Sequence, residues 1–326
     1  MSTLRRFLAV RANLLAVGLI LLVVVTAAAA PLLAPPIRGP GNTQDMGNIT
    51  SLAKPLPPDD VHRLGTVAGG ADVYTVVIWG TRDALRFGLV VTIATALIGV
   101  TIGAISGYFG GWVNTVLMRL TDAFLAFPAI ASVWMFSQVL FQGDLEAPAQ
   151  WQRALFAVQA SPVMLALIAF SWMPYARLIN ANVIRLKTFD FVEAARALGA
   201  SPARILVRHL LPNAIAPAIV LAARDVGGMV ILAAAFTFIG VGFGGSQWGA
   251  LLAGGRDYVI GISGNPLRYW WTFVPATLAI VIFGLGWNLL GDGFNRQLDP
   301  RAGRLGVLPG SPAPASASTP STQATS

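Results

Sequence analysis

The chain of 326 residues is 55% hydrophobic and only 11% charged, with a formal net charge of +8 and no cysteine. It is too apolar for an ordinary soluble globule, and the lack of cysteine excludes thiol redox chemistry. It has only two histidines and no Gly-Lys-Ser/Thr phosphate loop. We therefore expect no metal site, no bound cofactor and no ATP binding by such a loop. No basic stripe with interleaved aromatic residues points to nucleic acid.

Apolar runs of about 20 residues, long enough to cross a bilayer as helices, recur along the chain. Six are predicted, at 13–33, 87–109, 122–141, 162–184, 214–241 and 270–290. The first follows several arginines and ends in an alanine run, which is also typical of a cleaved secretory signal. Five further spans favour an uncleaved anchor. The sequence thus predicts an all-α polytopic membrane protein with six transmembrane helices.

Positive charge is dense at the N-terminus, between spans four and five, and after span six. Because basic residues near span ends favour the cytoplasmic side, we expect both termini and the loop 186–213 to be cytoplasmic. The segment from Ile37 to about Val67 is rich in Pro, Gly and Asp and should be extracytoplasmic, with little regular structure. After it, Asp72 is placed to cap a short interfacial helix through Trp79 and Arg82 that leads into span two.

Span two carries Gly99, Gly103 and Gly107, a repeated small-xxx-small spacing on one helical face. Such a face lets a neighbouring helix approach closely in lipid, although glycine is also simply common in membrane helices. Prolines fall within spans three to six, at positions 128, 174, 217 and 275. Each removes a backbone hydrogen bond and favours a kink. The kinks suit either a bundle that lines a changing cavity or a purely structural arrangement.

A polar stretch between spans four and five predicts a folded surface element. Asp190 and Glu193 match the spacing of a capping box, with Asp190 as N-cap and Glu193 reaching back from the first turn. Gly199 supplies the left-handed residue that ends this helix. We expect one apolar side on it, formed by Phe191, Val192, Ala195 and Leu198, while Ala194 and Ala197 keep it slim.

A second helix is predicted directly after Gly199. Ser201 is its N-cap and Pro202 its first helical residue, and residues 203–209 carry Arg204 and Arg208 toward span five. Two interpretations remain open for the whole stretch. It is either an ordinary cytoplasmic connector or a docking element whose small, partly apolar face fits a groove on another protein.

The motif Glu193-Ala194-Ala195, with Gly199 and the ending His209-x-Leu211-Pro212-Asn213, resembles the "EAA" loop of ABC importer permeases. The His-x-Leu-Pro-Asn ending is similar to the branch that imports dipeptides, oligopeptides and nickel. The likeness extends over most of the chain. Other matches follow in the expected order: Gly107-Tyr108-x-Gly110-Gly111, Met118-Arg119 with Asp122, Tyr175-Ala176-Arg177, Trp248-Gly249, Gly291-Asp292-Gly293 and Leu298-Asp299-Pro300-Arg301.

The chain departs from that pattern at several positions. Asn114 stands where the branch usually has Asp, and Asn180 where it usually has Arg. Further departures are Val67, Ala71, Val76, Ala84, Ala233 and Asn295-Arg296. They leave the loop intact but weaken any transfer of substrate preference.

The resemblance implies the shorter, C-type permease of a peptide importer, in a heterodimer with a second permease. Two ATPase subunits and an external solute-binding protein would complete the complex, and the chain itself would not be an enzyme. The implied fold is one anchor helix (1–35), an extracytoplasmic segment (36–82), a five-helix type I core (83–294) and a cytoplasmic C-terminal segment (295–326) that is disordered from about residue 309. Residues 190–198 would form a coupling helix seated in an ATPase cleft, and Arg208 would help support the loop.

Four charged residues lie in or at the ends of spans, where an ionised group is costly. Asp122 is most simply a helix-start cap, and Arg177 either snorkels or closes an inner gate. Arg224 and Asp225 point to different sides of span five. Our hypothesis is that one faces the translocation path and the partner permease neutralises the other.

Two other functions and several cargoes compete with the peptide permease. An ion-coupled secondary transporter would need inverted repeats and paired interrupted helices, and a membrane hydrolase would need clustered acid/base groups. Neither pattern occurs in the sequence. The cargo is a dipeptide, a longer peptide, a nickel chelate or another small solute, and the sequence leaves that choice open.

Overall fold

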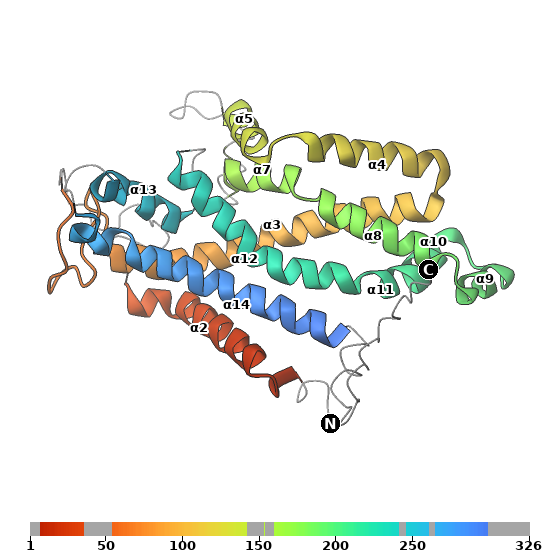
Figure 1. Cartoon of the computed structure of the whole chain (residues 1–326), viewed down its shortest axis with the longest axis horizontal. Helices are drawn as coiled ribbons and strands as arrows, with labels where there is room; N and C mark the ends of the chain where they lie inside the picture. Colours follow the sequence, from red (N-terminus) through yellow and green to blue (C-terminus); the bar gives the residue numbers. More distant parts are fainter. Residues whose placement is uncertain are drawn as a thin grey trace, which may run out of the picture.

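The computed structural model describes residues 7–35, 54–141, 153, 160–240, 246–260 and 265–298. Within these ranges every regular element is a helix, as the sequence predicted (Figure 1). The elements are α2 (Arg11–Leu33), α3 (Val73–Phe109), α4 (Gly111–Ala126), α5 (Ala129–Phe141), α7 (Pro162–Phe170), α8 (Met173–Leu186), α9 (Asp190–Ala197), α10 (Pro202–Arg204), η2 (Ile205–Leu210), α11 (Leu211–Ala214), α12 (Ala216–Phe238), α13 (Gln247–Ile260), η3 (Pro266–Thr272) and α14 (Val274–Leu298). The start of the predicted extracytoplasmic segment (37–53) and the predicted tail from residue 309 lie outside the described residues.

Five spans are long and apolar enough to cross a membrane: α2, α3, the α7–α8 stretch, α12 and α14. A sixth results if the bent pair α4–α5 is one span. The all-α polytopic prediction is therefore confirmed. The long helices lie roughly along one direction, with α9 at one end of the bundle and α13 at the other (Figure 1).

The prediction of a separate interfacial helix before span two was wrong. Asp72 does cap a helix, because its Oδ1 accepts from the amide of Thr75 at 2.7 Å. That helix, α3, then runs without a break for 37 residues to Phe109. No proline lies between Asp72 and Phe109, so the polar start and the apolar run form one helix.

The third span also differs from the prediction of one helix over 122–141. Helix α4 begins at Gly111, directly after a turn at Gly110, and Asp122 lies inside it rather than at its start. Helix α5 is bent by 90° from α4. The break is at Phe127, whose extended backbone (φ −75°, ψ 132°) is what a following proline favours.

The other predicted kinks are helix starts. Pro174 and Pro217 occupy the first turns of α8 and α12, and Pro275 is the second residue of α14. A proline in the first turn needs no backbone donor, so it starts a helix without cost. At these three positions a proline begins a helix rather than lying within a continuous one.

Helix α13, which was not predicted, folds back against the start of α3. Trp248 is 1% exposed, and its Nε1 donates to the carbonyl of Val77 at 3.0 Å. Gly80 faces the same indole ring, which leaves no room for a side chain there. With only 14 residues α13 is too short to cross a membrane as a helix.

Helix α2 is fastened to the core near both ends. At its start, the Asn13 amide donates to the Phe7 carbonyl at 2.8 Å and accepts from Arg296 of α14 at 2.7 Å. At its other end, Trp79 of α3 donates to the Ala34 carbonyl at 2.8 Å. These bonds hold the predicted anchor helix against α3 and α14.

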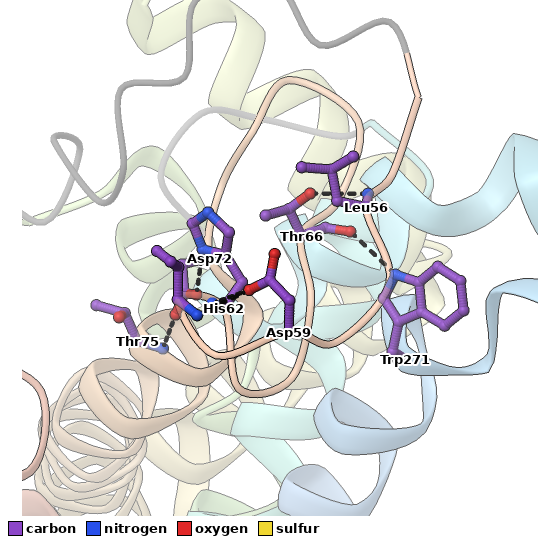
Figure 2. A network of polar contacts seen from close by, with 8 residues as sticks. Leu56, Asp59, His62, Thr66, Asp72, Thr75 and Trp271 are labelled. Carbon is purple, nitrogen blue, oxygen red and sulfur yellow. Dashed lines mark hydrogen bonds and ion pairs between the residues drawn. The ribbon is translucent and has the colours of Figure 1, made fainter.

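Residues 54–72 have no helix, as predicted, yet they form an ordered cap at the α13 end of the bundle (Figure 2). Asp72 accepts from Thr75 through one oxygen and contacts the His62 ring at 2.9 Å through the other. Thr66 bonds Leu56 on one side and accepts from Trp271 Nε1 at 3.2 Å on the other. The cap therefore ties the start of α3 to η3.

Candidate functional site

Helix α9 projects from one end of the bundle and carries most of the predicted docking residues (Figure 1). It spans Asp190–Ala197, but its N-cap is Phe189, and no side chain caps it. The prediction of a capping box with Asp190 as N-cap was therefore wrong, because Asp190 is already the first helical residue. Asp190 and Glu193 both lie in the first turn, where their negative charges complement the helix dipole.

Gly199 ends α9, as predicted, with a backbone φ of +75°. The Gly199 amide donates to the Arg196 carbonyl at 2.9 Å, and the Ala200 amide to the Ala195 carbonyl at 3.1 Å. These two bonds are the Schellman motif, which satisfies the last carbonyls of a helix. The helix end is thus fixed in geometry rather than frayed.

The expected single apolar side of α9 is divided between two surfaces. Val192 is fully buried and Ala195 nearly so, and both pack in a hydrophobic cluster with Val183, Leu186 and Ile205. Phe191 and Leu198 are instead exposed, Leu198 at 88%. Because residues 192 and 195 share one face of the helix, that face anchors α9, and the remainder stays available for contact.

The second helix begins at Ser201 and Pro202 as predicted, with the Ser201 hydroxyl accepting from the Arg204 amide at 3.4 Å. It then widens into a π-helix over Ile205–Leu210. Pro212 has no amide hydrogen, and its ring would crowd the carbonyl four residues earlier in an α-helix. The wider turn relieves this, and the Asn213 side chain donates through Nδ2 to the His209 carbonyl at 2.6 Å. The loop is thus connected to α12 through helical residues, Leu211, Pro212 and Asn213.

The three glycines of α3 face α8. A Cβ atom on Gly99 would collide with the Trp172 carbonyl oxygen, and one on Gly103 with the Ala176 carbonyl oxygen. A Cβ on Gly107 would lie 2.9 Å from the Asn180 carbonyl oxygen. Backbone atoms cannot move aside as side chains can, so this contact depends on glycine at all three positions.

The candidate gate residue Arg177 approaches Asp122 of α4, with 3.8 Å between Nη1 and Oδ1. Both side chains are more than half exposed, at 62% and 59%. The predicted role of Asp122 as a helix-start cap is wrong, because α4 has already begun at Gly111. The pair therefore joins exposed side chains of α8 and α4.

Arg224 and Asp225 do point to different sides of α12, and each finds a partner within the chain. Arg224 forms an ion pair with Asp292 of α14. Asp225 accepts from the Tyr175 hydroxyl of α8 at 2.7 Å. Sequence reasoning missed both partners, because helices distant in sequence bring them in. Arg224 therefore does not require neutralisation by another subunit.

The ion pair between α12 and α14 can be tested by removing its charges. We expect Arg224→Leu to lower the yield of folded protein several-fold, because the Asp292 carboxylate is left in a spanning helix without the cation that it pairs with. The double change Arg224→Leu and Asp292→Leu should recover most of the yield, since neither charge remains. The yield of folded protein of each variant is measured by size-exclusion chromatography of a fluorescent fusion. Equal yields for the single and double variants would contradict this prediction.

The chain matches the family model of the binding-protein-dependent transport system inner membrane component over residues 99–304. It is 32% identical to a probable D,D-dipeptide transport system permease protein of Escherichia coli, over 80% of each chain. It is 34% identical to a putative peptide transport system permease protein of Brucella suis, over 87% of each chain. It is 30% identical to an oligopeptide transport system permease protein of Mycobacterium bovis, over 93% of this chain and 96% of that protein. The chain therefore belongs to the family of inner-membrane components of binding-protein-dependent transport systems, the permeases of ABC importers.

Proposed function

We propose that this chain is one half of the translocation pathway of an ATP-driven peptide importer. A second permease would supply the other half, two ATPase subunits the energy, and an external solute-binding protein the cargo. The peptide class is supported by the named relatives, which are peptide, dipeptide and oligopeptide permeases. A nickel chelate or another small solute is the alternative cargo.

Helix α9 is the observation that carries the coupling part of this proposal. It is short, it is anchored on one face by Val192 and Ala195, and its end is fixed by Gly199. An anchored helix with a fixed C-terminal end passes a displacement to the bundle, whereas a loose loop would absorb it. We infer that an ATPase subunit binds the exposed face of α9, which includes Glu193 and Ala194.

The charge distribution supports an orientation with α9 and both termini in the cytoplasm of a prokaryotic cell. Lys and Arg are frequent around α9, at positions 185, 187, 196, 204 and 208. Basic residues close to membrane spans are retained on the cytoplasmic side. The cap at residues 54–72 would then face outward, toward the binding protein.

Crosslinking tests the proposed partner of α9. Because the natural chain has no cysteine, Ala194→Cys introduces a unique thiol on the exposed face of α9. We expect a thiol-directed crosslinker to join it to an ATPase subunit in native membrane vesicles, detected by mass spectrometry of the product. Val61→Cys, 80% exposed at the opposite end of the bundle, is the control and should give no such product. An Ala194→Cys chain that never reaches an ATPase would overturn the proposal.

The cargo is tested separately. The intact complex should be purified with its binding protein, and the bound solute released and identified by mass spectrometry. Peptides in the binding protein support the peptide class, whereas a nickel chelate establishes the alternative.

A further inference from the structure

A buried amide joins three helices close to α9. Asn180 of α8 is 8% exposed. Its Nδ2 donates to the Ser106 hydroxyl of α3 at 2.8 Å and to Oδ1 of Asn114 in α4 at 2.6 Å. We refer to Ser106, Asn114 and Asn180 as the amide cluster. Hydrogen bonds in a low-dielectric interior are strong and fix geometry when all members are satisfied.

Lys187 makes a second connection about two turns further along α8. Its Nζ donates to the carbonyl of Tyr108 at 3.0 Å and lies 3.4 Å from that of Gly107, both in the last turn of α3. A cation at a helix C-terminus is favoured by the helix dipole. The tight turn at Gly110 and Gly111, both with positive φ, leads from there into α4. Helix α8 is thus fastened to the α3–α4 corner at two levels.

The link between α8 and α9 is short and internally bonded. The Phe189 amide donates to the Leu186 carbonyl at 3.2 Å, and the Thr188 hydroxyl to the Arg185 carbonyl at 2.9 Å. Val192 of α9 packs in the same hydrophobic cluster as Leu186. A displacement of α9 therefore reaches α8 directly, through this link and this cluster.

Two of the positions at which the chain departs from the pattern it resembles are bonded to one another. Asn114 replaces the usual Asp and Asn180 the usual Arg, and the structure places their amides in direct contact. An Asp carboxylate and an Arg guanidinium at these two positions would also connect α4 and α8, through an ion pair. In this chain the neutral pair Asn114 and Asn180 makes the connection between α4 and α8.

We propose that Asn180, Asn114 and Lys187 are positioning residues that make α3, α4 and α8 move as one body when α9 is displaced. The amide cluster then determines how closely events on the outer face are coupled to ATP hydrolysis. This inference rests on the proposed function and adds the route by which a displacement of α9 is transmitted to α3, α4 and α8.

The test uses the complete complex, with both permeases and both ATPase subunits, reconstituted in liposomes. Stimulation of ATP hydrolysis by the purified binding protein, relative to basal hydrolysis, is the measured ratio, and it can be measured whichever solute is the cargo. We expect Asn180→Leu to lower this ratio by about fivefold or more, because the bond to Asn114 is lost, while the assembled complex still hydrolyses ATP. Asn182→Leu, on the same helix, is the matched control. The Asn182 Nδ2 is buried and makes no hydrogen bond, so the ratio should not change.

Two double variants separate positioning from packing. Asn114→Leu with Asn180→Leu removes both polar partners, so folding should be kept, but the ratio should stay low. Ser106 keeps its bond to the Gly103 carbonyl at 3.1 Å in this variant. Asn114→Asp with Asn180→Arg restores a polar connection and should restore the ratio.

A normal ratio in the double-leucine variant would overturn the inference, as would a low ratio in a folded Asp/Arg variant. Failure of the proposed function looks different. In that case the unmodified complex would show no stimulation by the binding protein at all.

Discussion

Uptake by the complex should fall by about tenfold or more when Gly199 is replaced by valine, while membrane insertion stays intact. Gly199 has a φ of +75°, and a Cβ atom there would meet nothing within 4 Å. The effect must therefore come from the backbone. A β-branched residue in the left-handed region costs about 1–2 kcal/mol, which favours loss of the Schellman bonds that fix the end of α9.

The control for this prediction is Gly199→Asn, since asparagine enters the left-handed region more readily than other residues. It should retain most of the uptake. Glu193→Lys tests the same helix at its start, because a cation there opposes the helix dipole and alters the exposed face, and it should also abolish uptake. Initial rates of labelled-substrate uptake and the amount of membrane-inserted protein are measured in parallel. Wild-type uptake in both Gly199→Val and Glu193→Lys would refute the proposed role of α9.

Gly103→Ala should destabilise the bundle by about 2–3 kcal/mol. The added Cβ would collide with the Ala176 carbonyl oxygen and lie 3.0 Å from the Asn180 amide nitrogen. Both are backbone atoms of α8, so the two helices must separate. The measured quantities are the apparent Tm and the monodisperse fraction in detergent, because membrane proteins often unfold irreversibly.

Gly18→Ala is the matched control for Gly103→Ala. Gly18 also lies in a spanning helix, α2, but a Cβ there would meet nothing within 4 Å. Because alanine favours helix more than glycine does, the control should leave the apparent Tm unchanged or raise it. Equal losses in the two variants would show that the α3–α8 contact does not depend on Gly103.

The helical membrane architecture and the turn signals at Gly199 and Ser201 were predicted correctly from the sequence, whereas Asp190 and Asp122 were wrongly assigned as helix caps. Gly199 and Ser201 act where the sequence placed them, because a left-handed turn and an N-cap depend on neighbouring residues alone. The start of span two was misplaced for the opposite reason. A helix capped at Asp72 does not end at the membrane surface merely because Arg82 and Arg86 are charged, and nothing in the local sequence stops α3.

Long-range partners could not be predicted from local patterns. Asp292 with Arg224, and Tyr175 with Asp225, come from helices far apart in the chain. Asn180 and Asn114 did carry a signal, since both depart from the family pattern, but their contact required the arrangement of α4 against α8. Val192 and Leu198 were both predicted on the apolar side of α9 because both are apolar. Only Val192 is buried by the neighbouring helices, and Leu198 is exposed.

The unbroken course of α3 gives the protein a rigid rod that reaches both of its faces. At 37 residues it is about 55 Å long, well beyond the roughly 30 Å hydrocarbon core of a bilayer. Its first residue follows Asp72 of the cap, and its last turn accepts hydrogen bonds from Lys187, close to α9. Rocking such a rod by about 10° about its centre would shift each end by about 5 Å in opposite directions. Under the proposed function, binding of the loaded solute-binding protein at one end and closure of the ATPase subunits at the other would then both be coupled to one tilt of α3.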